Sequence, residues 1–499
     1  MTVLLALPVV LPLLGAAVSL TISGRRRVQR ILGVAVCAAT LGNAGVVLQR
    51  VDAGGTQATQ LGGWPAPIGI TLVADRFSAV MLAISMAMVL AVLVYALGQL
   101  DPAREDSYFH PVYLILTAGV AASFLTGDLF NLFVAFEMML TASYVLLTLG
   151  GTGEQVRSGM TYVVISLVAS ILLVTAVALI YAATGTVNMA ELAGRLDAVP
   201  DGLRTALGLL LLCVFGVKAA IFPLFFWLPD AYPTAPTPIT ALFAGLLTKV
   251  GLYAIIRTQT LLFASPEPSS LLLVIAGATM VVGVLGAISQ NDVKRILSFH
   301  IISQIGYMVL GLGLFSLAGL AGAILYIVHH IVLKTTLFLV GGLVETATGT
   351  GALSELHGLA RRAPVLAWLF LLPALSLAGL PPFSGFVAKL TLVQAGLALD
   401  RELVVAVSLL VSLLTLFSMT KIWAGAFWGD PAEAAAPPIV GGQPLRLPAP
   451  MVGATASLVA LSLVIAVGSG PLYALSERAA ADLLDSGSYT SAVFGGAAR

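Results

Sequence analysis

Long apolar runs recur along this 499-residue chain and restrict its fold more than any other feature. Runs of 18 or more residues with few or no charges are long enough to cross the hydrocarbon core of a bilayer as helices. Composition agrees, because 59% of the residues are hydrophobic and only 9% are charged, with a mean hydropathy of +1.03. The sequence therefore predicts an all-α polytopic membrane protein.

The apolar runs predict about 14 transmembrane helices. The expected spans are residues 3–22, 31–49, 76–98, 109–126, 129–149, 159–183, two helices within 207–257, then 270–289, 296–314, 317–344, 364–397, 403–428 and 451–475. Four arginines between Arg25 and Arg30 mark a short cytoplasmic loop, which places the N-terminus outside and, after 14 spans, the C-terminus outside as well. We expect a multi-pass protein of the cell inner (cytoplasmic) membrane.

The lysines are placed differently from the arginines. Of the 24 basic residues only six are lysines, and only Lys294 falls in an evident loop. The other five lie within expected spans: Lys218, Lys249, Lys334, Lys389 and Lys421. A lysine inside a span costs roughly 3 kcal/mol or more, and unlike arginine it can give up its proton when desolvated. These lysines are therefore candidates for proton transfer, although Lys421, near a helix end, also fits a side chain that snorkels to the interface.

Two expected spans are interrupted by proline, each beside a lysine. Pro223 follows Lys218, and the pair Pro381 and Pro382 precedes Lys389. Proline removes a helix hydrogen bond, so we expect backbone carbonyls released by each break to lie near its lysine.

The interrupted spans also indicate an internal repeat. Each is the fourth of five helices, in helices 4–8 and helices 9–13, and a second lysine follows at almost the same distance in both blocks. Because five is an odd number, the second block enters the membrane from the opposite side, which predicts two inverted five-helix repeats. We expect residues 1–100 to form an N-terminal three-helix segment, 101–260 and 261–430 the two repeats, and 431–499 a C-terminal loop, the last helix and a polar tail.

Glu137 lies in the middle of an otherwise apolar run, where an unpaired carboxylate would be costly. An ion pair with Lys218 is the simplest solution. The proton affinity of each partner would then depend on the other, so that a charge arriving beside the pair could release a proton from Lys218. A static structural salt bridge is the alternative.

His330 and Lys334 are four residues apart and share one face of a helix. Two basic groups at this spacing disfavour simultaneous protonation, which is typical of a pair that passes protons. His329 points about a third of a turn away and fits an interface hydrogen bond equally well. Lys421 and Asp128 are further relay candidates, although Asp128, at a helix boundary, is favoured as a cap.

Other classes of function find little support. Cys37 and Cys213 lie far apart in apolar runs, and no histidines have zinc-site spacing, so we expect no metal site and no redox cofactor. The net charge of +1 gives no indication of nucleic-acid binding. The bilayer is the expected environment.

Several motifs resemble the antiporter-like proton-translocating family. KAAIFPLFFWLPDA at residues 218–231 is followed by APTP at 235–238 and by KVGLY at 249–253. KRILSFHIISQIGY at residues 294–307 and the segments 128–137, 330–337 and 379–389 also resemble family motifs. The family includes the antiporter-like membrane subunits of respiratory NADH:quinone oxidoreductase and the large subunits of multisubunit Mrp cation/proton antiporters.

Within this family the likeness is greatest to the D-type subunits of Mrp antiporters. Three features favour that branch: the length near 500 residues, the segment PTAPTPITALFAGLLTKVGLYAIIRT, and Phe225, where respiratory subunits often have histidine. Lys389 stands where some respiratory relatives have glutamate. The resemblance implies these roles: Glu137 and Lys218 form a coupled pair, Lys249, His330 and Lys334 a central relay, and Lys389 a terminal site.

The resemblance implies a proton-translocating subunit of a multisubunit antiporter that exchanges cytoplasmic sodium for external protons, and thus a secondary transporter and not an enzyme. Its partners would be other membrane subunits of a hetero-oligomer. The spans hold no carboxylate cluster like a sodium site, so we expect the chain to be inactive alone. The alternatives are a proton-pumping membrane subunit of a redox complex, resembling respiratory NADH:quinone oxidoreductase or a membrane hydrogenase, and a structural scaffold with inert buried charges.

Overall fold

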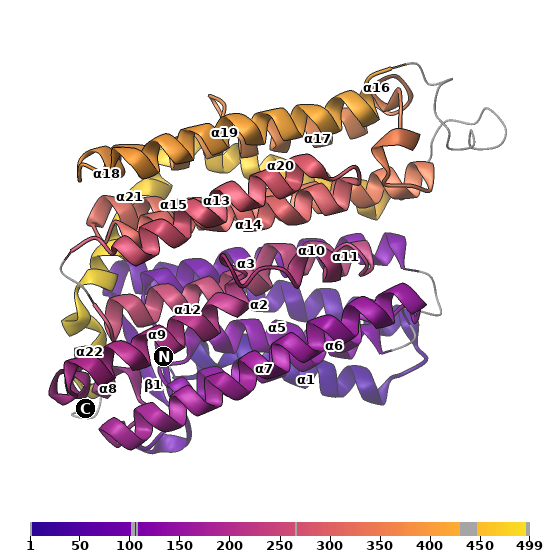
Figure 1. Cartoon of the computed structure of the whole chain (residues 1–499). Helices are drawn as coiled ribbons and strands as arrows, with labels where there is room; N and C mark the ends of the chain where they lie inside the picture. The colour runs from indigo at the N-terminus through magenta and orange to yellow at the C-terminus, as the bar shows by residue number, and fades with distance from the viewer. Residues whose placement is uncertain (1, 101–104, 106–107, 265–266, 430–446, 496–499) are drawn as a thin grey trace.

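The fold is a bundle of roughly parallel and antiparallel helices (Figure 1). The computed structural model describes residues 2–100, 105, 108–264, 267–429 and 447–495. The helices of the first half are α1 (Thr2–Thr21), α2 (Arg26–Gly54), α3 (Arg76–Gln99), α5 (Phe109–Leu125), α6 (Leu129–Leu147), α7 (Gly153–Thr184), α8 (Met189–Arg195), α9 (Asp201–Ala219), α10 (Leu228–Ala231), α11 (Thr237–Leu242) and α12 (Thr248–Leu261).

The second half continues in the same way. Its helices are α13 (Ser270–Ser289), α14 (Val293–Gly313), α15 (Leu317–Thr348), α16 (Leu359–Arg362), α17 (Pro364–Ala378), α18 (Ser384–Leu397), α19 (Glu402–Ile422), α20 (Ala449–Val467), α21 (Ser469–Leu484) and α22 (Ser486–Gly495). Strands β1 (Gln57–Gln60) and β2 (Thr71–Ala74) form an antiparallel hairpin between α2 and α3.

Twelve helices of the described chain are long and apolar enough to cross a membrane. Phe109–Leu125 and Pro364–Ala378 are also apolar but shorter. The multi-pass, all-α membrane architecture is therefore confirmed. The number of 14 stays a prediction, because it counts the two shorter helices as spans.

The helices that carry Lys249 and Lys334 lie inside the bundle. Thr237–Leu261 and Leu317–Thr348 are buried along the whole of their most apolar stretch, whereas Gly153–Thr184 is buried along only 39% of it. In Figure 1, α13, α14 and α15 lie between α17 to α19 on one side and α9 and α12 on the other. The inner helices thus carry their polar side chains where lipid does not reach them.

Two helix ends repeat the same local structure. α7 ends at Thr184 and α15 ends at Thr348, and in each case the threonine hydroxyl oxygen accepts a hydrogen bond from the backbone N–H two residues later, at 3.4 Å. Asp128 and Asp292, which cap α6 and α14, each pair with the chain four residues beyond these threonines. The two helix ends therefore share one local motif, while the two five-helix repeats and their inverted orientation stay predictions.

Two further helices form near the C-terminus, where the sequence predicted a polar tail. The expected span 451–475 divides at Gly468, and α21 and α22 follow α20. α21 packs on α15 and α3 because one face is apolar, with Ala479, Ala480 and Leu483 buried. The expected C-terminal loop lies mostly at residues 430–446, outside the described residues.

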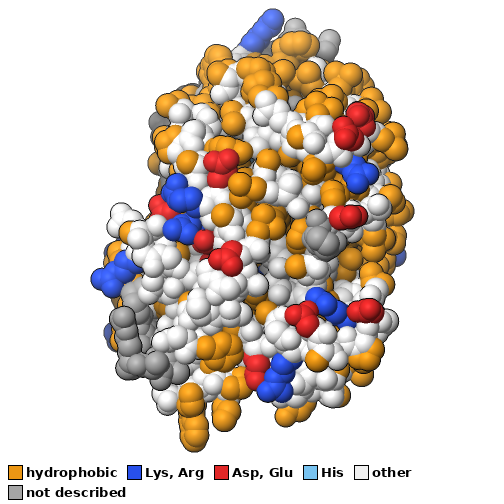
Figure 2. All heavy atoms as spheres, turned by 90° about the vertical axis from the view of Figure 1, so that its left-hand side faces the viewer, with side chains coloured by type: hydrophobic (Ala, Val, Ile, Leu, Met, Phe, Trp, Pro, Cys, Tyr) orange, Lys and Arg blue, Asp and Glu red, His pale blue; other side chains and the backbone are white. Residues whose placement is uncertain are grey.

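One end of the bundle has a mixed charged surface. Figure 2 shows the end at the left of Figure 1, where α1 begins and α22 lies, and acidic and basic side chains are interspersed over it. Arg478 pairs with Asp52 at 2.9 Å, and Arg195 pairs with Glu191 of the same helix at 2.5 Å. Exposed pairs of this kind contribute little stability each. The charged side chains therefore keep this end of the bundle hydrated more than they stabilise the fold.

The placement of Lys294 in a loop is wrong. Asp292 caps α14 by accepting from the backbone N–H of Arg295, so the helix begins at Val293, before the expected start. Lys294 therefore lies in the first helical turn, where it is buried and pairs with Glu345 of α15 at 2.6 Å.

Candidate functional site

Glu137 and Lys218 lie close together, with a serine between them. Ser170 of α7 donates a hydrogen bond from its Oγ to Oε1 of Glu137, and Lys218 Nζ donates to the same Oγ at 3.3 Å. Lys218 also donates to the backbone oxygen of Ser166 at 3.0 Å. Among the described residues no ion pair joins Glu137 to Lys218, so the predicted direct contact is replaced by a hydroxyl that touches both.

The first interruption lies next to Lys218 but does not supply its hydrogen-bond acceptors. α9 ends at Ala219, and Ala220 takes a left-handed conformation with φ of 59°, so the chain leaves the helix before Pro223. Trp227 Nε1, from beyond the break, donates to the backbone oxygen of Val217 at 3.0 Å. The ammonium group of Lys218 is directed to α7 and bonds Ser166 and Ser170, so it does not use the carbonyl of Ala219 that the break releases.

Lys249 is completely buried and bonds within its own helix. Its Nζ donates to the backbone oxygen of Ala244 at 2.5 Å and to Oγ1 of Thr248 at 3.2 Å. Ala244 belongs to a π-helical turn, Phe243–Leu247, that joins α11 to α12. π-helical turns inside α-helices often occur at functional sites, and this one directs a carbonyl to the ammonium group.

The predicted pair on α15 has one bonded and one unbonded member. Lys334 Nζ donates to the backbone oxygen of Leu297 in α14 at 3.3 Å. Both ring nitrogens of His330 are buried and have no hydrogen-bond partner among the described residues. His329, by contrast, has its Nδ1 2.8 Å from Oγ of Ser384, the first residue of α18. The structure therefore ties His329, and not His330, to the second interrupted helix.

Lys389 lies at the second interruption and uses the carbonyls that the break exposes. α17 ends at Ala378, α18 begins at Ser384, and Pro381 and Pro382 lie in the link. Lys389 Nζ donates to the backbone oxygens of Leu377 and Ala378, both at 3.1 Å. It also donates to Ser412 Oγ at 2.9 Å and lies 5.0 Å from the ring centroid of Tyr307. The expected contact between a lysine and released carbonyls is thus present at this break.

Lys421 has a different role from the other lysines within spans. Its Nζ donates to the backbone oxygens of Ile288 and Gln290, at 2.9 and 2.6 Å, and so satisfies carbonyls at the C-terminal end of α13. A cation at this position also complements the helix dipole. Lys421 is therefore a helix-capping residue in this structure and does not contact the other candidates.

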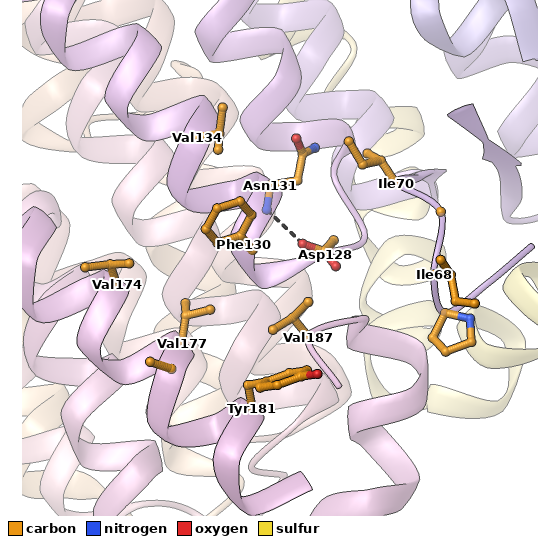
Figure 3. A pocket seen from close by; sticks show the side chains of 13 residues that line it. Ile68, Ile70, Asp128, Phe130, Asn131, Val134, Val174, Val177, Tyr181 and Val187 are labelled. Carbon is orange, nitrogen blue, oxygen red and sulfur yellow. Dashed lines mark hydrogen bonds between the residues drawn. The ribbon is translucent and has the colours of Figure 1, made fainter. Parts of the chain in front are cut away.

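Asp128 also has a local structural role. Its Oδ1 accepts from the backbone N–H of Asn131 at 2.8 Å, which caps α6 as the sequence favoured. Figure 3 shows this bond beside an apolar pocket of about 520 Å³. Ile70 of the hairpin loop, Phe130 of α6 and Tyr181 of α7 line the pocket with Asp128. The buried position raises the pKa of Asp128.

Sequence reasoning missed the polar partners that connect the helices. Ser170 and Ser384 look like ordinary small residues of apolar helices, and nothing in the sequence separates them from other serines. Tyr326 and Gln304 also bond each other, from α15 and α14. The QIGY motif contained a signal, because a glutamine within an apolar span needs a partner.

Arg257 is a buried arginine within a membrane span. It is buried in α12, and its Nη2 lies 2.6 Å from Oδ2 of Asp75, the residue that caps α3. The guanidinium also lies over the rings of Tyr253 and Tyr489. A buried pair of this kind is structural, because removal of either partner would leave a buried charge. In the part of the chain that the structure describes, no three His, Cys, Asp or Glu side chains converge as metal ligands would.

More than half of the chain matches one family in sequence. Residues 126–415 match the family described as NADH:quinone oxidoreductase/Mrp antiporter, TM. The chain belongs to this family of antiporter-like membrane subunits.

Comparison with individual relatives places the chain more narrowly. It is 44% identical to the D subunit of the Na(+)/H(+) antiporter of Alkalihalophilus pseudofirmus, over 98% of this chain and 99% of that one, and 39% identical to the D subunit of the Bacillus subtilis antiporter, over 98% of each. A chain of the Mrp complex of Dietzia sp. superposes with a TM-score of 0.91 at 37% identity, over 99% and 100% of the two chains. A chain of an archaeal membrane-bound sulfane sulfur reductase superposes at 0.87 with 27% identity, over 98% and 99%. Within the family, the chain is therefore of the Mrp D type.

Proposed function

We propose that this chain is a proton-translocating subunit of a multisubunit Na+/H+ antiporter of the inner membrane. One observation carries the proposal: four lysines, Lys218, Lys249, Lys334 and Lys389, are buried in a membrane bundle and hydrogen-bond only to neutral oxygens among the described residues. Because no carboxylate of the described chain pairs with them directly, their positive charge is poorly compensated, and each can exist with or without its proton.

The proposed proton path runs through these groups in order. Glu137 and Lys218 lie in the first repeat, Lys249 and Lys334 on the inner helices, and Lys389 at the interrupted helix of the second repeat. The unbonded ring of His330 supports a wet path in the centre, because buried polar groups are almost always hydrogen-bonded and water is the remaining partner. Protonation of one lysine would then disfavour protonation of the next.

Partner subunits are part of the proposal. Glu137 is only partly buried, and it lies on α6 near Phe130 and Val134, whose exposed fractions are 50% and 45%. A carboxylate on a face otherwise suited to lipid is costly, so a neighbouring membrane subunit is the expected cover. The similar proteins support a hetero-oligomer of this kind, because two are subunits of Na(+)/H(+) antiporters and one is a chain of an Mrp complex. Sodium is accordingly the exchanged cation in the proposal. Transport should require the hetero-oligomer.

The test uses the complete hetero-oligomer reconstituted in vesicles that carry a pH gradient. Addition of sodium should drive proton movement, read with a pH-sensitive dye. Glu137→Gln, Lys218→Met and Lys389→Met should abolish it, and Lys218→Arg should fail as well because guanidinium keeps its proton. Lys421→Met, which removes a lysine that caps a helix, is the matched control and should retain most transport.

Other outcomes separate the alternatives. Full transport by Lys218→Met and Lys389→Met in assembled complexes would refute the proton path and favour a structural scaffold. Robust sodium-dependent proton movement by this chain alone would refute the need for partners. Purification with redox subunits would favour the redox-pump alternative, which the 27% identity to the sulfane sulfur reductase chain supports less than the 37–44% identity to Mrp-type chains.

A further inference from the structure

The hydroxyl of Ser170 occupies the place where Glu137 and Lys218 would otherwise touch. It comes from α7, whereas the carboxylate comes from α6 and the ammonium group from α9. Ser170 is buried, with 4% of its surface exposed. Three helices therefore converge on one hydroxyl oxygen.

Hydroxyl groups in apolar helices usually bond the carbonyl one turn earlier in their own helix. Thr175, also on α7, follows this pattern, because its Oγ1 donates to the backbone oxygen of Ile171 at 2.7 Å. Ser170 departs from it and donates across the helix interface to Glu137. The difference shows that the Ser170 hydroxyl is engaged by the charged pair and not by local backbone.

A hydroxyl has the donor and acceptor capacity that this position needs. An ammonium group can only donate, and an ionised carboxylate can only accept. The Ser170 oxygen accepts from Lys218 and donates to Glu137 at the same time. A small cavity that admits about one water lies beside Lys218, but it is lined by Tyr162, Ser166 and Trp227 and not by Ser170 or Glu137.

We propose that Ser170 relays a proton between Lys218 and Glu137, an inference that rests on the proposed function. In the forward step an N–H bond of Lys218 breaks as a new O–H bond forms on Ser170. The original O–H bond of Ser170 breaks as one forms on Oε1 of Glu137. The products are a neutral amine, a neutral carboxylic acid and an unchanged hydroxyl, so two opposite charges disappear and no ion leaves the site.

The relay explains how the pair can be coupled without a salt bridge. While both groups are charged, Lys218 is held by Ser170 and by the carbonyl of Ser166. After the step, the protonated Glu137 can return its proton through the same hydroxyl to the neutral amine. Alternatively, the amine accepts a proton from elsewhere on the path, and Glu137 then keeps its own. Ser170 thus sets the rate at which the two ends of the pair exchange a proton.

Substitutions at Ser170 test the relay in the complete hetero-oligomer. Ser170→Ala removes the hydroxyl and should slow sodium-driven proton movement at least about tenfold, because a proton-transfer group typically contributes about 10²- to 10⁴-fold. Ser170→Thr keeps the hydroxyl and should retain at least half of the rate. Thr175→Ala, the matched control, removes a hydroxyl that bonds only its own helix and should transport normally.

Infrared difference spectroscopy measures the protonation of Glu137 directly, a signal that would not change if Ser170 had only a structural role. A carboxylic-acid band that disappears in Glu137→Gln identifies the protonation of Glu137. That band should respond to the pH gradient in the wild type and in Ser170→Thr, but not in Ser170→Ala. If Ser170→Ala does not assemble, Ser170→Cys, similar in size but a weak hydrogen-bond donor, takes its place with the same expectation.

A wild-type transport rate in assembled Ser170→Ala would overturn the relay, and so would an unchanged response of the Glu137 band in that variant. Equal loss of transport in the alanine and threonine variants would also overturn it, because the hydroxyl would then not matter. Failure of the proposed function looks different. In that case the unaltered complex would exchange no sodium for protons, while the Glu137 band would still depend on the Ser170 hydroxyl.

Discussion

Replacing Gly251 with alanine tests the close crossing of α9 and α12 beside Lys218. A Cβ added at Gly251 would lie 2.7 Å from the backbone nitrogen of Ala219 and 2.9 Å from the carbonyl carbon of Lys218. Both are backbone atoms, so no side-chain rotation relieves the contact, and the helices must separate by about 0.7 Å to reach van der Waals distance. We expect destabilisation of about 1–3 kcal/mol, roughly a 5- to 150-fold change in an equilibrium constant.

The separation should also disturb the site. The hydrogen bond from Lys218 to Ser170 is already 3.3 Å long, so a shift of several tenths of an ångström in α9 would weaken it. The assay combines thermal unfolding of the purified hetero-oligomer with sodium-driven proton movement. Gly251→Ala should lower both the unfolding temperature and the transport rate.

Gly277→Ala is the matched control for this prediction. Gly277 lies in α13, and a Cβ there would meet no atom within 4 Å. Alanine inside a helix should leave stability unchanged or raise it by about 0.5–1 kcal/mol. If Gly251→Ala proved as stable and as active as Gly277→Ala, the close crossing would not constrain the site as reasoned.

Three further predictions follow from individual contacts. His330→Ala should slow transport at least about tenfold, whereas His329→Gln, which can keep a hydrogen bond to α18, should lose less of the transport rate. A larger loss in His329→Gln than in His330→Ala, measured in vesicles, would contradict the proposed central path. Burial raises the pKa of Glu105, but hydrogen bonds from Arg30 and a nearby histidine outweigh it and leave the pKa below its usual value. The stability gained is present above the unfolded pKa, about 4.3, and is lost as the pH falls through the folded-state pKa, so unfolding temperatures of wild type and Glu105→Gln should converge in acid and diverge toward neutral pH. Asp75→Asn should cost about 3–5 kcal/mol by leaving its buried arginine partner uncompensated, and normal thermal stability of that variant would contradict the ion pair.

The membrane spans could be predicted because apolar runs of fixed length have few structural solutions in a bilayer. The second interruption could also be read from sequence, since two adjacent prolines leave carbonyls that the next cation can reach. The partners of Lys218 could not. Whether its flexible side chain turns to the broken end of α9 or to α7 depends on helix packing, and in the folded chain the ammonium group bonds Ser166 and Ser170 of α7.

Burial of cations was harder to predict than their presence. Lys294 looked like a loop residue because it lies in a polar, charged stretch. Asp292 caps α14 within that stretch, so the helix begins earlier than expected and Lys294 lies opposite Glu345. The C-terminal helices were missed because their small residues, alanine, serine and glycine, give weak hydropathy. Their apolar face becomes evident only against α15.

The ion pair between Arg76 and Asp482 bears on how the chain is made. The two residues are 406 positions apart, and Arg76 Nη1 lies 2.8 Å from Oδ1 of Asp482, while its Nε lies 3.0 Å from Oδ1 of Asp52. Membrane helices are inserted as they are synthesised, so Arg76 can pair with Asp52 early. It can pair with Asp482 only after nearly the whole chain has left the ribosome. A chain that ends before α21 would leave Arg76 with Asp52 as its one carboxylate partner among the described residues, so α3 would be fully neutralised only when synthesis is nearly complete.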